Sequence, residues 1–274
     1  MVAPPSTLPI EIAIDRRRAR APQVYEALRD AILDLRLKPG THVSENSICR
    51  QSKVSRTPVR EALIRLAQDE LISVFPQQGS VVAPIRLKKV IEACFVREAL
   101  EVSILRLAAA VWTSEDSAIV DAILDRQQRH AADGDYRAFF REDESFHYNF
   151  ARVAGLEDIS AIIADSITHL VRIRRLADPT EGHMERAISE HREVLECLRR
   201  GDTESAVAAL TQHLSRVVQT MMRLSNRFPE FFGDLGGQAE TIPAAMRRHL
   251  SRVAATAVAA PPSARRRAVR RRTA

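Results

Sequence analysis

Apolar residues recur at helical spacing along most of the chain. The first such run starts at Gln23 and stops at Lys38-Pro39-Gly40, because proline and glycine end helices. It predicts a first helix over residues 23–36. Residues 1–20 have no sustained apolar period and carry a cluster of four arginines, so we expect a flexible basic arm there.

Two further helices and a hairpin follow. Ser44 can accept hydrogen bonds from the first amides of a short helix, and Ser55 can do the same for a helix over residues 56–69. Residues 72–83 contain two short apolar runs around a polar turn, which indicates a β-hairpin. This order of elements is typical of a winged helix-turn-helix, which we place at residues 21–85.

Beyond Pro84 the pattern changes to long helical periods with short breaks. Such connections are typical of an antiparallel bundle, so we predict an all-α domain over residues 86–226. Its six predicted helices cover residues 87–112, 115–132, 135–154, 156–177, 183–200 and 202–225. The sequence after Asn226 is rich in glycine, alanine and arginine, which bury too little apolar area to fold. We therefore expect residues 227–274 to be a mostly disordered basic tail, with a marginal helix at most over 241–257.

Composition supports a mainly α fold. The chain has 274 residues, enough for two domains, and 45% of them are hydrophobic but only 5% aromatic, which suits the packing of aliphatic helices. The three cysteines lie far apart, so neither a disulfide framework nor a thiolate zinc site is indicated. We see no signal peptide and no apolar run long enough to span a membrane, and we expect a cytoplasmic protein without a membrane partner.

The positive charge lies at the two ends of the chain. The net charge of +6 divides into +3 over residues 1–85, −4 over residues 86–225 and +7 over residues 226–274. Basic ends permit a polyanionic partner, because lysine and arginine gain affinity when they release counterions from phosphates. The arginine-rich end could add non-specific nucleic-acid affinity, or it could be a solvated chain end.

The second helix of the predicted helix-turn-helix carries two candidate DNA-reading side chains. Arg56 and Arg60 are four residues apart and share one helical face, where each guanidinium can bridge guanine O6 and N7 or bind a phosphate. The alternative is a solvated face on which both arginines lie near Glu61. Those residues alone favour the alternative, but the surrounding order of elements favours DNA reading.

Residues 24–85 resemble the DNA-binding domain of the GntR family. The resemblance rests on Leu37-Lys-Pro-Gly40, Val54-Ser-Arg-Thr-Pro-Val-Arg-Glu-Ala-Leu63, Leu71-Ile72 and Gly79. It implies that operator DNA is the partner. It also implies that Arg56 and Arg60 contact bases or phosphates, Ser55 and Thr57 nearby phosphates, and the wing around Gly79 the adjacent minor groove.

The bundle carries a candidate metal-binding set. Asp143 and His147 lie at positions i and i+4 of one predicted helix, and His191 and His213 lie one in each of the last two helices. One carboxylate and three imidazoles suit a divalent ion such as zinc or nickel and can leave coordination positions open. Each histidine taken alone is more often a surface or core residue.

Residues 88–225 resemble the FCD effector domain of FadR-type GntR regulators. The matching pattern is Phe95-Val-Arg-Glu-Ala-Leu-Glu101, Asp143-x3-His147, Glu190-His191, Gly201-Asp202 and His213. The resemblance implies that Asp143, His147, His191 and His213 are metal ligands and that Arg97 meets the carboxylate of an effector. An intrahelical pair with Glu101 is an equally weighted alternative for Arg97. The remaining candidates His130, His169 and His183 have no matching role, and we expect them at the surface.

These features predict a ligand-responsive transcription regulator. The resemblance implies a homodimer that binds double-stranded operator DNA and acts as a repressor released by a small carboxylate, with a divalent metal, zinc first, as cofactor. Two alternatives stay open. The bundle could be a metal-dependent enzyme acting on a small carboxylate, although no separate acid or base has a recognisable spacing, or its metal could be purely structural.

Overall fold

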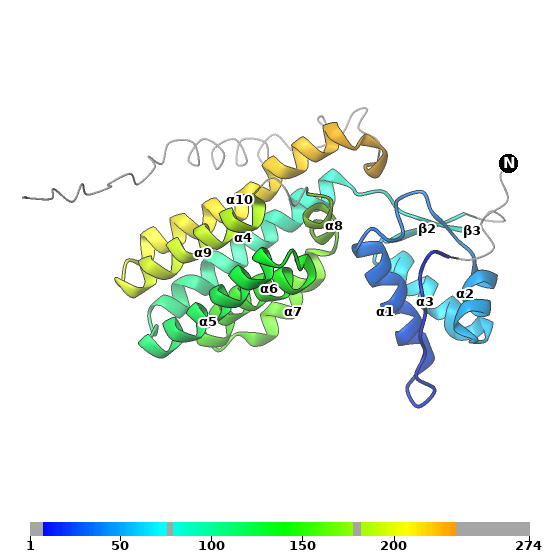
Figure 1. Cartoon of the computed structure of the whole chain (residues 1–274), viewed down its shortest axis with the longest axis horizontal. Helices are drawn as coiled ribbons and strands as arrows, with labels where there is room; N and C mark the ends of the chain where they lie inside the picture. The colour runs from blue at the N-terminus through cyan, green and yellow to red at the C-terminus, as the bar shows by residue number, and fades with distance from the viewer. Residues whose placement is uncertain (1–7, 76–78, 178–181, 234–274) are drawn as a thin grey trace, which may run out of the picture.

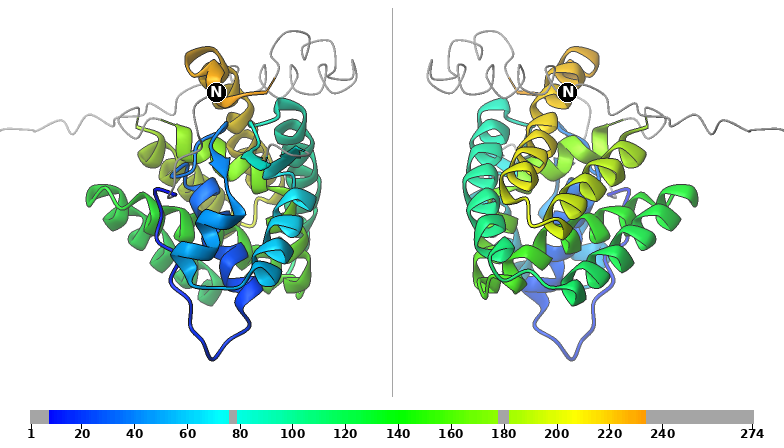
Figure 2. Two further views of the ribbon diagram at one scale, coloured as in Figure 1. Left: turned by 90° about the vertical axis from the view of Figure 1, so that its right-hand side faces the viewer. Right: turned by 90° about the vertical axis from the view of Figure 1, so that its left-hand side faces the viewer.

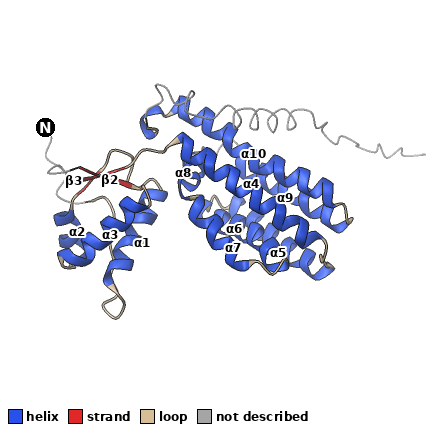
Figure 3. Ribbon diagram, turned by 180° about the vertical axis from the view of Figure 1, so that it is seen from behind, coloured by secondary structure: helices blue, strands red, loops and turns tan. Residues whose placement is uncertain are grey.

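The structure, a computed structural model, describes residues 8–75, 79–177 and 182–233. In this part of the chain ten α-helices, three short strands and one 3-10 helix form an N-terminal domain and a helical bundle (Figures 1 and 3). In the end-on views of Figure 2 the N-terminal domain lies in front of the bundle from one side and behind it from the other. The predicted mainly α fold is confirmed.

The N-terminal domain is built on three helices and a small antiparallel sheet. Apolar residues of the first and third helices meet in one core, with Val24, Leu28 and Leu66 fully buried. The strand order is β1-β3-β2, and Gly79, at the start of β3, has a φ of +92° that favours glycine. The elements are α1 (Arg20–Leu33), β1 (His42–Val43), α2 (Glu45–Ser52), α3 (Arg56–Gln68), β2 (Ile72–Phe75) and β3 (Gly79–Val82).

The predicted flexible arm is wrong for residues 8–19. Leu8, Ile10 and Ile12 are buried in the core of the N-terminal domain. The Gln51 side chain accepts a hydrogen bond from the Leu8 amide at 3.0 Å and donates to the Leu8 and Ile10 carbonyl oxygens. Three alternating apolar residues are too few to predict a structured segment from sequence, but in the structure they pack as an extended segment. Residues 1–7 lie outside the described residues.

The two predicted helix caps differ. The Ser44 hydroxyl accepts from the Ser47 amide at 3.4 Å, as predicted, whereas Ser55 occupies the N-cap position of α3 without a side-chain cap hydrogen bond. The exposed Ser55 hydroxyl is therefore available to another partner. The two-residue strand β1 was not predicted, because so short a strand has no period of its own.

Seven helices form the bundle. Helices α5 and α6, α9 and α10, and α4 and α10 pack side by side around a core that includes Phe146, Val194 and Leu210. The helices are α4 (Leu87–Ala109), α5 (Ser114–Ala132), α6 (Tyr136–Val153), α7 (Glu157–Ser166), α8 (Thr168–Leu176), α9 (His183–Arg199) and α10 (Thr203–Arg227). No helix in the described ranges is long and apolar enough to cross a membrane.

One predicted helix, over residues 156–177, is two helices. The chain bends at Ile167, whose side chain is buried, and α8 then runs at the end of the bundle that faces α1 (Figure 1). The apolar period continues through the bend, so the sequence gives no break signal. The bend brings α8 into contact with the N-terminal domain.

The chain stays ordered beyond the predicted end of the bundle. A 3-10 helix, η2 (Pro229–Phe231), follows α10, and Phe232 is buried beside Ile85 in the segment between the domains. The Ile85 amide donates to the Phe231 carbonyl at 2.9 Å, and the Gly233 amide donates to the Ile85 carbonyl at 3.1 Å. The tail prediction is thus wrong for residues 227–233. Residues 234–274 lie outside the described residues.

Candidate metal centre and nucleic-acid interface

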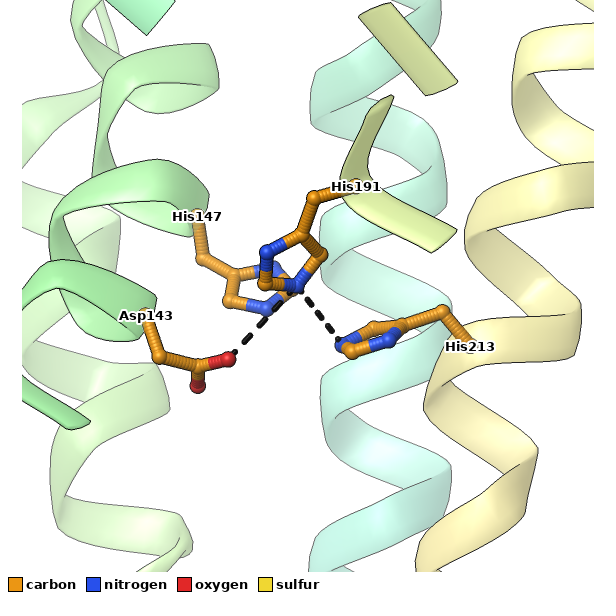
Figure 4. Close-up of side chains that lie close together, drawn as sticks. All are labelled: Asp143, His147, His191 and His213. Carbon is orange, nitrogen blue, oxygen red and sulfur yellow. Dashed lines mark hydrogen bonds and ion pairs between the residues drawn. The ribbon is translucent and has the colours of Figure 1, made fainter. Parts of the chain in front are cut away.

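The four predicted metal ligands meet inside the bundle (Figure 4). Asp143 and His147 lie one turn apart on α6, His191 lies on α9 and His213 on α10. One ligand atom from each side chain lies within 4.8 Å of the others. The Nε2 atom of His191 is 3.2 Å from Nε2 of His213 and 3.5 Å from Oδ1 of Asp143.

The local sequence of α6 determines where the candidate ligands Asp143 and His147 lie. The Asp135 carboxylate caps α6 by accepting from the Ala138 amide at 2.9 Å, which sets where the helix begins. Phe146, next to His147, is fully buried and stacks on the His191 ring with centroids 3.9 Å apart. The helical spacing then places Asp143 and His147 on the face that meets His191.

An oxygen atom lies beside the Nδ1 atom of each histidine. Gln127 Oε1 is 3.0 Å from Nδ1 of His191, and Glu190 Oε2 is 2.9 Å from Nδ1 of His213. Glu101 Oε2 is 2.7 Å from Nδ1 of His147, but the two atoms are not aligned for a hydrogen bond. For His191 and His213, an oxygen at Nδ1 favours the tautomer that keeps its proton there and leaves the Nε2 lone pair free for a metal ion.

The arrangement fits a divalent cation. Both ring nitrogens of His147 are buried and have no hydrogen-bond partner among the described residues. Two Nε2 lone pairs that face each other at 3.2 Å repel unless a cation or proton lies near them. Burial, followed by the charge of its histidine neighbour, lowers the pKa of His191 to about 3, and burial lowers that of His213 to about 4. Both imidazoles are therefore neutral at pH 7, as a metal requires.

The carboxylate ligand is ionised. Burial alone would raise the pKa of Asp143, but Arg174 and the nearby histidines hold it well below its usual range. Arg174 Nη1 donates to Asp143 Oδ2 at 2.7 Å, which leaves Oδ1 on the side of His191. Three neutral imidazoles and one carboxylate make a set that suits zinc, nickel or a similar ion.

Two cavities open beside this cluster. The larger has a volume of about 910 Å³ and is lined by Asp143 and His213. The smaller, of about 660 Å³, is lined by Asp143 and His147 and extends to α1 of the N-terminal domain. A small molecule in either cavity would therefore lie next to ligands of the cluster.

The predicted DNA-reading residues lie at the start of α3 and on the wing. The Arg56 and Arg60 side chains are 67% and 61% exposed, and they line a groove of about 870 Å³ together with Gly79. Ser55 and Thr57 are also exposed at this end of α3. The N-terminus of α3 and two exposed guanidinium groups suit a phosphate backbone.

The comparisons with known proteins agree with both domains. Residues 20–82 match the model of the bacterial regulatory proteins of the gntR family, and residues 92–216 match the FCD domain. An HTH-type transcriptional regulator in an unstable DNA locus of Streptomyces ambofaciens is 35% identical, over 82% of this chain and 94% of that protein. The chain belongs to the GntR family.

Further relatives of this GntR regulator carry the same type of name. The HTH-type transcriptional repressor RspR of Escherichia coli (strain K12) is 28% identical, over 77% of this chain and 93% of that protein. A solved GntR structure from Rhodococcus sp. RHA1 has a TM-score of 0.62 at 24% identity, covering 75% of this chain and 99% of that one, which shows the shared fold. The chain is a DNA-binding transcriptional regulator with a GntR domain followed by an FCD domain.

Arg97 of the GntR regulator takes the alternative partner. It is 3% exposed and forms an ion pair with Glu101, one turn along α4. Arg97 also lines the smaller cavity, and Glu101 in turn lies against His147. Its role toward an effector stays a prediction, while its contact with Glu101, which lies against the candidate ligand His147, is a finding.

Sequence reasoning missed two neighbours of the candidate site residues in this regulator. Glu45 forms ion pairs with Arg60 at 2.9 Å and Arg56 at 3.8 Å, and Gln127 Oε1 lies at Nδ1 of His191. Both make their contacts between different helices, so no spacing in the sequence marks them.

The predicted surface position of His169 is wrong. Its side chain is 6% exposed, and burial lowers its pKa to about 4.

Proposed function

We propose that this GntR regulator is a repressor whose metal centre binds a small organic acid. The observation that carries the proposal is the convergence of three imidazole nitrogens and one ionised carboxylate beside two cavities rich in arginine. Arginine binds carboxylates through two parallel hydrogen bonds. The FCD match, and the repressor named among the relatives, support the same function.

In this proposal Asp143, His147, His191 and His213 hold a divalent ion, zinc or nickel. When bound, the ion supplies a Lewis-acidic coordination position for a carboxylate oxygen. The residues of the chain do the rest. Arg174 keeps Asp143 ionised, and the oxygens at Nδ1 of His191 and His213 favour the tautomer that frees Nε2. Arg97, beside the smaller cavity, binds the acid if it exchanges Glu101 for the ligand.

We further propose that two copies of the chain bind a two-fold operator site in the cytoplasm. Paired recognition helices must enter successive major grooves, which requires a dimer with matching symmetry. Arg56 and Arg60 contact bases or phosphates, Ser55 and Thr57 contact phosphates, and the wing around Gly79 contacts the minor groove. A phosphate or base then replaces Glu45 as the partner of Arg60.

Binding of the purified protein to its flanking intergenic DNA tests the function. We expect a specific complex at physiological salt that a member of a panel of small organic acids dissociates, with the response lost after chelation. A metal that stabilises the protein with no effect of any acid would favour a structural metal. Turnover of an acid at a metal-dependent rate would favour an enzyme. No binding at low ionic strength would refute the proposal.

A further inference from the structure

The two cavities share a wall that is rich in positive charge. Four arginines and two carboxylates line both cavities: Asp34, Arg36, Arg137, Asp143, Arg174 and Arg175. The wall thus holds more guanidinium groups than carboxylates. Asp143 is a member of the metal cluster, whereas Asp34 belongs to the other domain, at the C-terminal end of α1.

Asp34 is held by arginines of the bundle. Its Oδ1 atom is 3.2 Å from Arg175 Nε on α8, and its Oδ2 atom forms an ion pair with Arg137 on α6. Arg36, two residues along the chain, is 3.9 Å away and adds a weaker contact. The Asp34 side chain is only 15% exposed, so these contacts are partly shielded from water.

The surroundings of these two guanidinium groups favour an anion. Arg175 lies over the Phe140 ring at 5.0 Å and is 18% exposed, so it is partly desolvated, whereas Arg137 is 56% exposed. Burial, followed by the charge of Arg137, lowers the pKa of Arg175. Two guanidinium groups that contact the same carboxylate repel each other, and an anion between them offsets this repulsion.

We propose that Arg137 and Arg175 form an anion-binding site that Asp34 fills in this state, and that a second anionic group of the effector binds there by displacing Asp34. The inference rests on the proposed function, because it assumes that an effector enters the cavities. It identifies the ligand class as a small dianion, either a dicarboxylate or a phosphorylated compound. One anionic group would lie at the metal cluster and the other at the Asp34 site.

Displacement of Asp34 would change how the domains contact each other. Arg174 and Arg175 are adjacent on α8, and the first contacts the metal ligand Asp143 while the second contacts Asp34 of α1. A ligand that occupies the wall therefore acts at once on the cluster and on the ion pairs between α1 and the bundle. The size of the change in domain contacts depends on how much more tightly the ligand binds the state with Asp34 displaced than the state with Asp34 in place.

Titration of inorganic phosphate, and separately of succinate, into the full-length protein without DNA tests the site. Replacing Asp34 by Asn removes the competing carboxylate, so we expect Asp34→Asn to bind either dianion about tenfold more tightly than the wild type. Asp30→Asn is the matched control. Asp30 lies one turn earlier on α1, lines the smaller cavity and has no ion pair among the described residues. We expect its affinity to stay within about twofold of the wild type.

Hydrogen exchange supplies an independent readout. Saturating dianion should increase exchange at the C-terminal turn of α1 in the wild type, whereas Asp34→Asn should show that increase without ligand. Arg175→Gln should weaken dianion binding, which keeps the inference testable if Asp34→Asn folds poorly. Equal dianion affinity in the wild type and Asp34→Asn, or unchanged affinity in Arg175→Gln, would overturn it.

The two proposals can fail separately. If an organic acid releases operator DNA equally well from the wild type and from Asp34→Asn, effector sensing stands and the Asp34 site fails. If no acid affects operator binding but Asp34→Asn still tightens phosphate binding, the anion site stands and the sensing function fails. Comparing the dissociation constants of phosphate and succinate then shows which class of dianion the arginine-rich wall binds more tightly.

Discussion

Removing the metal should destabilise the FCD domain by a measurable amount. The four ligands come from α6, α9 and α10, so the cluster exists only while these helices are packed. A ligand that binds the folded state alone stabilises it by about 2.7 kcal/mol at 100 times its dissociation constant. For a domain of this size that corresponds to a melting temperature higher by about 5–11 °C.

The assay is thermal unfolding of chelated protein with and without added zinc, together with elemental analysis of the bound metal. Replacing His191 and His213 by Ala should remove both the bound metal and the thermal shift. His130→Ala is the control, because His130 is a half-buried histidine on α5 outside the cluster. Because the donor atoms already lie within 4.8 Å of one another, binding should need little rearrangement.

Two results would refute this reasoning. Full metal occupancy in the His191→Ala and His213→Ala double variant would show that the ion binds elsewhere. An identical melting temperature with and without zinc or nickel, in protein shown to be folded, would show that the four converging side chains do not form a metal site. Metal content and melting temperature measured for His130→Ala show whether the effects come from removing a metal ligand or from removing any histidine.

Three further predictions concern other parts of the molecule. Arg60→Ala should weaken operator binding by about 1–3 kcal/mol in a fluorescence-anisotropy titration, while Arg65→Ala, whose guanidinium lies over the Tyr25 ring, should weaken it less. Glu190→Gln should lower metal affinity about tenfold in a chelator competition, because the carboxylate holds Nδ1 of a ligand histidine; an unchanged affinity would contradict this. Burial, followed by Arg172, lowers the pKa of His169 from 6.5 to about 4. The folded state keeps His169 neutral while the unfolded chain takes up a proton below pH 6.5. The free energy of unfolding should therefore fall by about 3 kcal/mol between pH 6.5 and 4, relative to His169→Gln, in urea titrations. The same dependence of unfolding free energy on pH in both proteins would contradict this.

Sequence periodicity predicted the two-domain, mainly α fold because most helices present an apolar stripe to one core. It located α3, α5 and α6 to within about two residues. Periodicity did not predict the segments whose structure depends on contacts with distant parts of the chain. Leu8 and Ile12 are too few to form a period, and the bend at Ile167 lies inside an unbroken apolar pattern. Burial against another element orders these segments.

The candidate metal site was predictable from residue types and family resemblance, but its surroundings were not. The three predicted histidines and Asp143 converge, since one turn of α6 and two further helices bring them together. Gln127 is an ordinary amide on α5 in sequence, yet its oxygen holds His191 in the tautomer that frees Nε2. Such partners act across helices that are distant in the chain, so their role appears only in three dimensions.

Helix α8 shows the same limit most clearly, because its arginines resemble a solvated basic face in sequence. Arg172 is fully buried and donates to the Ala83 carbonyl at 2.8 Å, in the segment between the domains. Arg174 contacts Asp143 of the candidate metal cluster, and Arg175 contacts Asp34 of α1. One short helix therefore contacts the linker, the candidate metal cluster and the DNA-binding domain. We predict that a change at one of these three partners shifts the other two, which would couple the proposed effector site to DNA binding.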